Sequence, residues 1–183
     1  MKRTLIAVLS MLAFSAITFA QASQEDLEKA LLPAPATLKE GATVIKWKSD
    51  FTYDTLKKGT NKLVCYDRSG QPGQRPFAAE CTSSANLERV AQNLKIEAAN
   101  PDPKAKRAAF EELEKAGKWT KPEYGSVWYH VSGQNAASAN KHVTIAVPGA
   151  TGKMLGLPED GKQGSVWVMD GGSSEAHLMI PGQ

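Results

Sequence analysis

The chain has 183 residues, with 22 Lys and Arg against 19 Asp and Glu. Two of the basic residues, Lys2 and Arg3, stand near the N-terminus, and without them 20 basic and 19 acidic residues remain, interspersed along the chain. This near-neutral balance gives no electrostatic basis for binding nucleic acid, and the length suits one domain.

Residues 1–22 have the pattern of a secretory signal peptide. Lys2 and Arg3 precede an uncharged apolar run at residues 5–19, and Ala20-Gln21-Ala22 follows the small-x-small pattern of a cleavage site. The apolar run is shorter than the ~20 residues that span a bilayer, so a membrane anchor is the less favoured alternative. We expect cleavage after Ala22, or else after Ala20, and a secreted or periplasmic domain at residues 23–183 without a transmembrane segment.

Cys65 and Cys81 are the two cysteines of the chain. Export leads to an oxidising compartment, so an even number of cysteines predicts a disulfide between them. The alternative is a metal-binding or redox-active pair, but the wide spacing is far from C-x-x-C.

The N-terminal part of the expected domain predicts one short helix followed by three strands. Ser23 is a candidate cap, Leu27 and Leu31 share a helix face, and prolines end the helix. Alternation predicts the strands, the first with Ile45 and Trp47 inward, and the Gly59 turn favours a hairpin of the second and third strands. The strands are expected at residues 42–48, 51–56 and 62–68.

Two helices are predicted in the middle of the chain. The first, at residues 84–98, has an apolar stripe at helical spacing and Ser83 or Ser84 as its N-cap. The second, at residues 104–116, begins after Asp102 as N-cap with Pro103 at N1, and Gly117 ends it.

The last third returns to strands, which we expect at residues 125–132, 141–148, 165–170 and 175–180 and which form two hairpins. Gly-Ser-Val-Trp occurs at 125–128 and again at 164–167, which is either an internal duplication or chance. The resulting fold class is α+β: an antiparallel sheet of about six to seven strands, two central helices packed on it and a short N-terminal helix.

All three histidines lie in this last third. Alternation places His130 and His142 on one sheet face as cross-strand neighbours, and His177 would have to reach them from the other hairpin. Three imidazoles suit zinc or copper, and Met154, Met169 and Met179 would add soft ligands that favour copper(I). The alternative is that these are half-exposed strand histidines and that the methionines fill gaps in the core.

Trp128 and Trp167 lie on strand faces opposite the valines that flank them. One sheet face that carried both would be a candidate binding surface. The favoured alternative is that the two central helices cover that face.

A resemblance covers the central turn, the cysteines and the last hairpin. Gly59-Thr60-Asn61 leading to Cys65, together with Trp167 and His177-Leu178-Met179-Ile180, resembles small exported bacterial proteins of no assigned activity. This resemblance supports export and a bacterial source, and it implies no reaction, ligand or catalytic residue.

The sequence holds neither a G-x-S-x-G element nor a phosphate-binding loop. We therefore expect an exported, non-catalytic module that binds a small ligand or a partner protein. The alternatives are a metal-binding protein or metal-dependent enzyme that uses His130, His142 and His177, and a structural protein of the cell envelope.

Overall fold

The computed structural model describes residues 24–163 and 166–182. The predicted signal peptide, the Ser23 cap and the start of the second Gly-Ser-Val-Trp lie outside these residues. Within them, no helix has the length and apolar character needed to cross a membrane.

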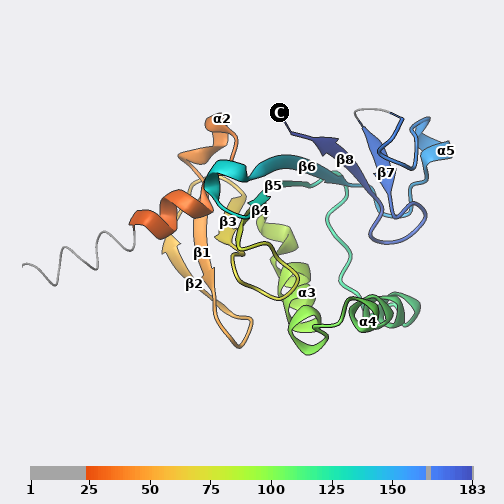
Figure 1. Cartoon of the computed structure of the whole chain (residues 1–183), viewed down its shortest axis with the longest axis horizontal. Coiled ribbons are helices and arrows are strands. Elements are labelled where there is room, and N and C mark those ends of the chain that lie inside the picture. Colours follow the sequence, from red (N-terminus) through yellow and green to blue (C-terminus); the bar gives the residue numbers. More distant parts are fainter. Residues whose placement is uncertain (1–23, 164–165, 183) are drawn as a thin grey trace, which may run out of the picture.

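A single eight-stranded sheet organises the fold (Figure 1), with the strand order β2-β1-β3-β4-β5-β6-β8-β7. All neighbours are antiparallel except β1 and β3, which are parallel. The strands are β1 (Thr43–Trp47), β2 (Tyr53–Lys57), β3 (Leu63–Asp67), β4 (Phe77–Ser83), β5 (Val127–Gly133), β6 (Asn140–Ala146), β7 (Trp167–Met169) and β8 (His177–Pro181). The α+β class is confirmed, while the sheet is mixed and larger than predicted.

Short helical segments accompany the sheet along the chain. A helical segment at residues 24–30 opens the described part. The remaining helices are α2 (Ala36–Lys39), the 3₁₀ turn Ser84–Asn86, α3 (Leu87–Ala99), α4 (Pro103–Lys115), the 3₁₀ turn Ala136–Ser138 and α5 (Gly152–Leu155). As predicted, Asp102 caps α4, where its side chain accepts a hydrogen bond from the Ala105 N–H.

The predicted hairpin of the second and third strands is wrong. β2 instead pairs with β1, after a turn in which the Lys48 N–H donates to the Thr52 carbonyl at 2.8 Å. Gly59 does not turn the chain back onto β2. It lies against the start of β1, where an added Cβ would stand 2.3 Å from the Gly41 carbonyl oxygen, so only glycine fits. The chain crosses β1 there and enters β3 on the other side.

β4 is the strand that the sequence did not predict. Its core is Ala78-Ala79-Glu80, which lacks the β-branched and aromatic residues that favour strands. It nevertheless pairs with β3 and β5, and the disulfide of Cys65 with Cys81 joins it to β3. The predicted disulfide is therefore present, between residues directly opposite each other.

The core has one layer on each face of the sheet. On one face, Val44, Cys65 and Cys81 pack with Ala30, the last residue of the N-terminal helical segment, and with Leu31, which follows it. On the other face, α3 covers the sheet, and the buried members of that layer are Ile45, Val64, Tyr66, Val90 and Leu94. The prediction that Ile45 and Trp47 face the core is thus confirmed, with Trp47 packed at the edge of the α3 layer.

The second central helix contributes less than expected. α4 has no buried residue, and it lies beside α3 (Figure 1) rather than adding a second buried helix to the sheet. Phe110 of α4 stacks on Trp119 with ring centroids 4.7 Å apart. Because α4 does not pack into the core, a groove lies on the sheet face formed by β5, β6 and β8.

Candidate functional site

The groove has a volume of about 430 Å³ and lies between α3 and the face formed by β4, β5, β6 and β8. This volume is in the range of small-molecule sites. Its apolar walls include Val90, Pro122, Trp128, Ala146, Met169 and Met179. Its polar walls include Arg68, Glu80, Arg89, Asn93, Glu97, His130, His142, Thr144, Glu175 and His177.

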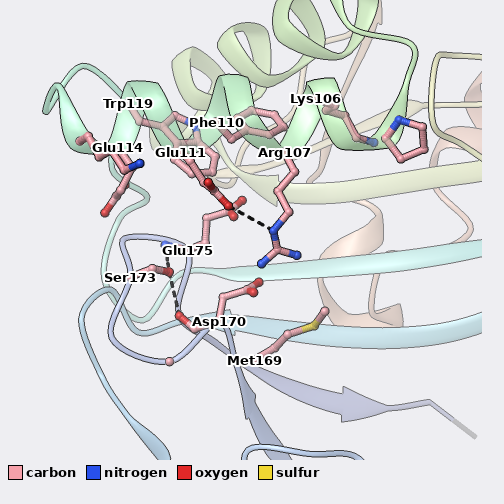
Figure 2. A pocket seen from close by; sticks show the side chains of 13 residues that line it. Lys106, Arg107, Phe110, Glu111, Glu114, Trp119, Met169, Asp170, Ser173 and Glu175 are labelled. Carbon is pink, nitrogen blue, oxygen red and sulfur yellow. Dashed lines mark hydrogen bonds and ion pairs between the residues drawn. The ribbon is translucent and has the colours of Figure 1, made fainter.

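A larger cavity of about 630 Å³ adjoins the groove, between α4 and the turn that joins β7 to β8. Figure 2 shows that Arg107 and Glu111 of α4 form an ion pair on one wall, facing Met169, Asp170 and Ser173 on the other. That ion pair is exposed, with 78% and 55% of the two side chains accessible. We take the groove as the site because its charged groups are buried and mutually positioned.

Strand register builds a polar row across four strands of the groove. Tyr66 on β3 lies opposite Glu80 on β4, Glu80 lies opposite His130 on β5, and His130 lies opposite His142 on β6. Side chains at directly opposed positions on one face are neighbours. The sheet therefore places a phenol, a carboxylate and two imidazoles side by side, in that order.

Glu80 is the centre of this row. Its Oε2 accepts hydrogen bonds from the Tyr66 hydroxyl at 3.2 Å and from Arg68 Nη1 at 3.4 Å. Its Oε1 lies 3.6 Å from His130 Nδ1. Burial by itself raises the pKa of Glu80, but the Arg68 guanidinium, His130 and Tyr66 outweigh burial and lower this pKa to about 2. Glu80 is thus a carboxylate at any physiological pH.

His130 and His142 stack face to face, with ring centroids 4.4 Å apart and an interplanar angle of 6°. His130 also lies between Glu80 and Thr144, since its Nδ1 faces Glu80 and its Nε2 is 3.3 Å from Thr144 Oγ1. Burial, followed by the neighbouring His130, lowers the pKa of His142 to about 4. His142 is therefore a neutral imidazole at pH 7, and among the described residues no hydrogen bond to its ring is found.

Two arginines hold α3 in place beside the groove. Arg68 Nη2 donates to Glu97 of α3 at 2.7 Å, so one guanidinium bridges Glu80 and Glu97. Arg89 of α3 donates to the Thr120 carbonyl, lies 4.3 Å from the Trp119 ring and 3.7 Å from Glu175. These pairings leave the wall close to electrically neutral.

Glu175 is the most perturbed acid at the rim of the groove. Burial raises its pKa, and Arg89 only partly offsets this, so that the pKa is about 7. Glu175 can therefore donate or accept a hydrogen bond near neutral pH, depending on its protonation state.

The structure brings together four of the five histidines and tryptophans that we predicted for a metal site or a binding surface. His130, His142, His177 and Trp128 all line the groove. Trp167 shares their sheet face through its register with Met179 on β8. It lies outside the groove, against the loop at Gly161, where an added Cβ would be 3.2 Å from its ring.

The predicted three-histidine metal site stays a prediction, but the geometry does not favour it. The lone pair of an imidazole lies in the ring plane, so the lone pairs of two stacked rings lie in separate, parallel planes and do not converge on one ion. Both nitrogens of His130 also have protein neighbours, Thr144 and Glu80. In residues 24–163 and 166–182, no group of three or more His, Cys, Asp or Glu side chains is placed to hold a metal ion.

Sequence reasoning missed the charged members of the site. Glu80 lies on the strand that was not predicted, and Arg68 and Glu97 meet across 29 positions of sequence. The alternation of residues 62–68, in which Tyr66 and Arg68 fall on one strand face, is the signal that points to this arginine. Without β4, nothing in the sequence indicated that a carboxylate stands beside His130.

The fold and the groove define an α+β protein with a disulfide in its sheet and a half-polar, half-apolar site of small-molecule size. No family model, no curated protein and no solved structure matches the chain.

We predict that Glu80→Gln lowers the free energy of unfolding by about 3–5 kcal/mol, because it leaves the buried Arg68 with only one of its two carboxylates. The Arg68 side chain is 6% exposed and the Glu80 side chain 13%. Denaturant unfolding at pH 7 measures the loss. Glu88→Gln, on the exposed face of α3, is the matched control and should change stability by less than about 0.5 kcal/mol. Equal stability of the two variants would contradict the assigned role of Glu80.

A second prediction concerns pH and His142. Its pKa is about 4 in the folded chain against an ordinary value of 6.5, so the unfolded chain binds more protons between these values. The neutral imidazole therefore contributes stability that is fully present above about pH 6.5 and is lost as the pH falls toward 4.

His142→Phe keeps a stacked ring without a titrating group. Its stability should fall less steeply than that of the wild type between pH 6.5 and 4, as measured by urea unfolding at several pH values. Glu80 titrates below this window, and Glu175 is common to both proteins, so the difference between the two curves isolates His142. Parallel curves would show that His142 is not held neutral by the fold.

Proposed function

We propose that the chain is an exported, non-catalytic binding protein that holds a small ligand without net charge in the groove beneath α3. The observation that carries this proposal is the neutral, stacked His142 on the wall of a groove of small-molecule size. An imidazole in this state offers one donor and one acceptor, and it costs less to desolvate than a charged group.

The charges around the groove support a ligand that is uncharged or zwitterionic. Arg68 is shared by Glu80 and Glu97, and Arg89 faces Glu175. An anion or a cation that broke the Arg68 bridge would leave a buried charge uncompensated, because Arg68, Glu80 and Glu97 are all largely buried. A neutral molecule can form hydrogen bonds with His142 and with Glu175, in either protonation state of Glu175, without that cost.

The apolar part of the wall supports a ring-containing ligand. Trp128 and the imidazole stack supply flat surfaces, and Met179 supplies an adaptable side chain beside them. Trp128 lies opposite Thr144 on β6, and Thr144 lies opposite Met179 on β8, so the three line one row of the sheet.

Export of the chain is part of the proposal and rests on the leader-like residues 1–22 and the disulfide, which suits an oxidising compartment. A cell-envelope structural protein remains an alternative. Exposed large apolar side chains occur on separate segments, including Leu38 of α2, Tyr53 of β2 and Met154 of α5. They do not support that alternative with one broad surface.

The test is a thermal-shift screen with matched sets of uncharged ring compounds, zwitterions, anions and cations. A ligand at 100 times its Kd adds about 2.7 kcal/mol, which raises the Tm by about 5–10 °C for a chain of this size. Only the first two sets should give such shifts, and Trp128→Ala and His142→Ala should abolish them.

Tyr124→Ser is the control for this screen, because Tyr124 is 68% exposed and does not line the groove. It should keep the full shift. Stabilisation mainly by anions or cations, or a shift that survives both groove variants, would overturn the proposal.

One specific row of side chains favours a second candidate function, hydrolysis of a small ester. Thr144 Oγ1, His130 and Glu80 follow the order hydroxyl, imidazole, carboxylate, with contacts of 3.3 and 3.6 Å. This is the order of a nucleophile, its general base and the group that orients the base. In this candidate the hydroxyl oxygen bonds to the ester carbonyl carbon, its proton passes to His130 and then to the leaving alcohol, and water releases the acid.

If this second candidate holds, the protein releases p-nitrophenol from p-nitrophenyl acetate, and Thr144→Val lowers the rate by about 100-fold or more. The control is Thr37→Val on the exposed α2, which should keep the rate. A wild-type rate no higher than that of Thr144→Val would exclude the hydrolase and leave the binding proposal intact.

A further inference from the structure

The outer end of the groove brings one histidine and two methionines to the same sheet face. Met169 on β7 lies directly opposite His177 on β8, and Met179 lies two residues beyond His177 on β8. Residues two apart on a strand share a face. All three side chains line the groove.

The register places these side chains within reach of one small ion. Directly opposed residues have Cβ atoms about 4.5–5.5 Å apart, and diagonal neighbours about 7–8 Å, which long side chains can bridge. Met169 and Met179 are such a diagonal pair, because Met179 lies opposite Trp167. Methionine has three rotatable side-chain bonds, so two thioethers can turn toward His177 without moving the backbone.

The His177 ring is already oriented as a ligand. Its Nδ1 is 2.7 Å from the backbone carbonyl oxygen of Glu175. A carbonyl only accepts, so Nδ1 carries the proton and Nε2 keeps its lone pair in the neutral tautomer. Metal-binding histidines are commonly held in this way, with the second ring nitrogen donating to a backbone carbonyl.

We propose that Cu(I) binds at this end of the groove, with Nε2 of His177 and the sulfur atoms of Met169 and Met179 as its ligands. Thioethers are soft ligands that select Cu(I), whereas zinc sites use thiolate, imidazole and carboxylate ligands. The cysteines do not compete for the ion, because Cys65 and Cys81 are joined to each other and fully buried. This site goes beyond the proposed ligand of the groove and does not depend on it.

The test is competition for Cu(I) between the full chain and the chelator bathocuproine disulfonate, in the absence of oxygen and with ascorbate. We expect one Cu(I) per chain. His177→Asn, Met169→Leu and Met179→Leu should each weaken binding by about 10-fold or more. Leu is a volume-conserving replacement for Met, so these two variants should fold.

Two matched controls separate this site from general binding by methionine or histidine. Met154 on α5 is 72% exposed and lies outside the groove, so Met154→Leu should keep full affinity. His142→Phe should keep it as well, which distinguishes this site from the three-histidine alternative. An equal loss in Met154→Leu and Met169→Leu, or no competition by the wild type, would overturn the proposal.

A measurement on the wild type covers the case in which a variant fails to fold. With ¹³C-methyl methionine, added Ag(I), a soft ion of the same charge, should shift the methyl signals of Met169 and Met179 and leave that of Met154 unchanged. Shifts confined to Met154, or no shifts, would also overturn the proposal. The thermal-shift screen contains no metal, so the two proposals fail independently.

Discussion

The site depends on the two ion pairs of the buried Arg68 guanidinium. This guanidinium joins Glu80 on β4 to Glu97 on α3, and so fixes the helix over the sheet at one place. Such a pair adds little net stability compared with a well-packed apolar replacement, because both charges must leave water. It does specify position, since any other placement of α3 would leave a buried charge without a partner. We therefore regard it as the contact that sets the location and shape of the groove.

The groove follows from a change in the character of the sheet beneath α3. Toward β1 and β3, Ile45 and Val64 belong to one apolar layer with Val90 and Leu94 of α3. Toward β5 and β6, the same face carries His130 and His142 instead. Imidazoles and a carboxylate cannot be packed under an apolar helix stripe without partners. The polar row supplies partners within the sheet, and the helix closes over only part of it.

The hairpins of the last third and one face of the site could be predicted from the sequence, because alternation there is regular. It placed His130 opposite His142 and Trp128 on the same face, as the structure has them. The sequence did not predict β4, because Ala78-Ala79-Glu80 becomes a strand only through pairing with a strand on each side. It also misled at Gly59, where the glycine serves a close backbone crossing rather than a hairpin turn. Both errors concern contacts between distant segments, which local pattern does not encode.

The disulfide links the local sequence of β4 to the place of this strand in the sheet. β4 has weak intrinsic strand preference, yet it holds Glu80 at the centre of the polar row. Its bond from Cys81 to Cys65 closes a loop of 16 residues, which in the chain-entropy model favours the folded state by about 3 kcal/mol. The link also fixes the register of β4 on β3, and a slip of one residue would turn Glu80 to the opposite face, away from Arg68 and His130. The disulfide therefore does more than stabilise the fold: it helps to keep the Glu80 carboxylate on the sheet face where the groove lies.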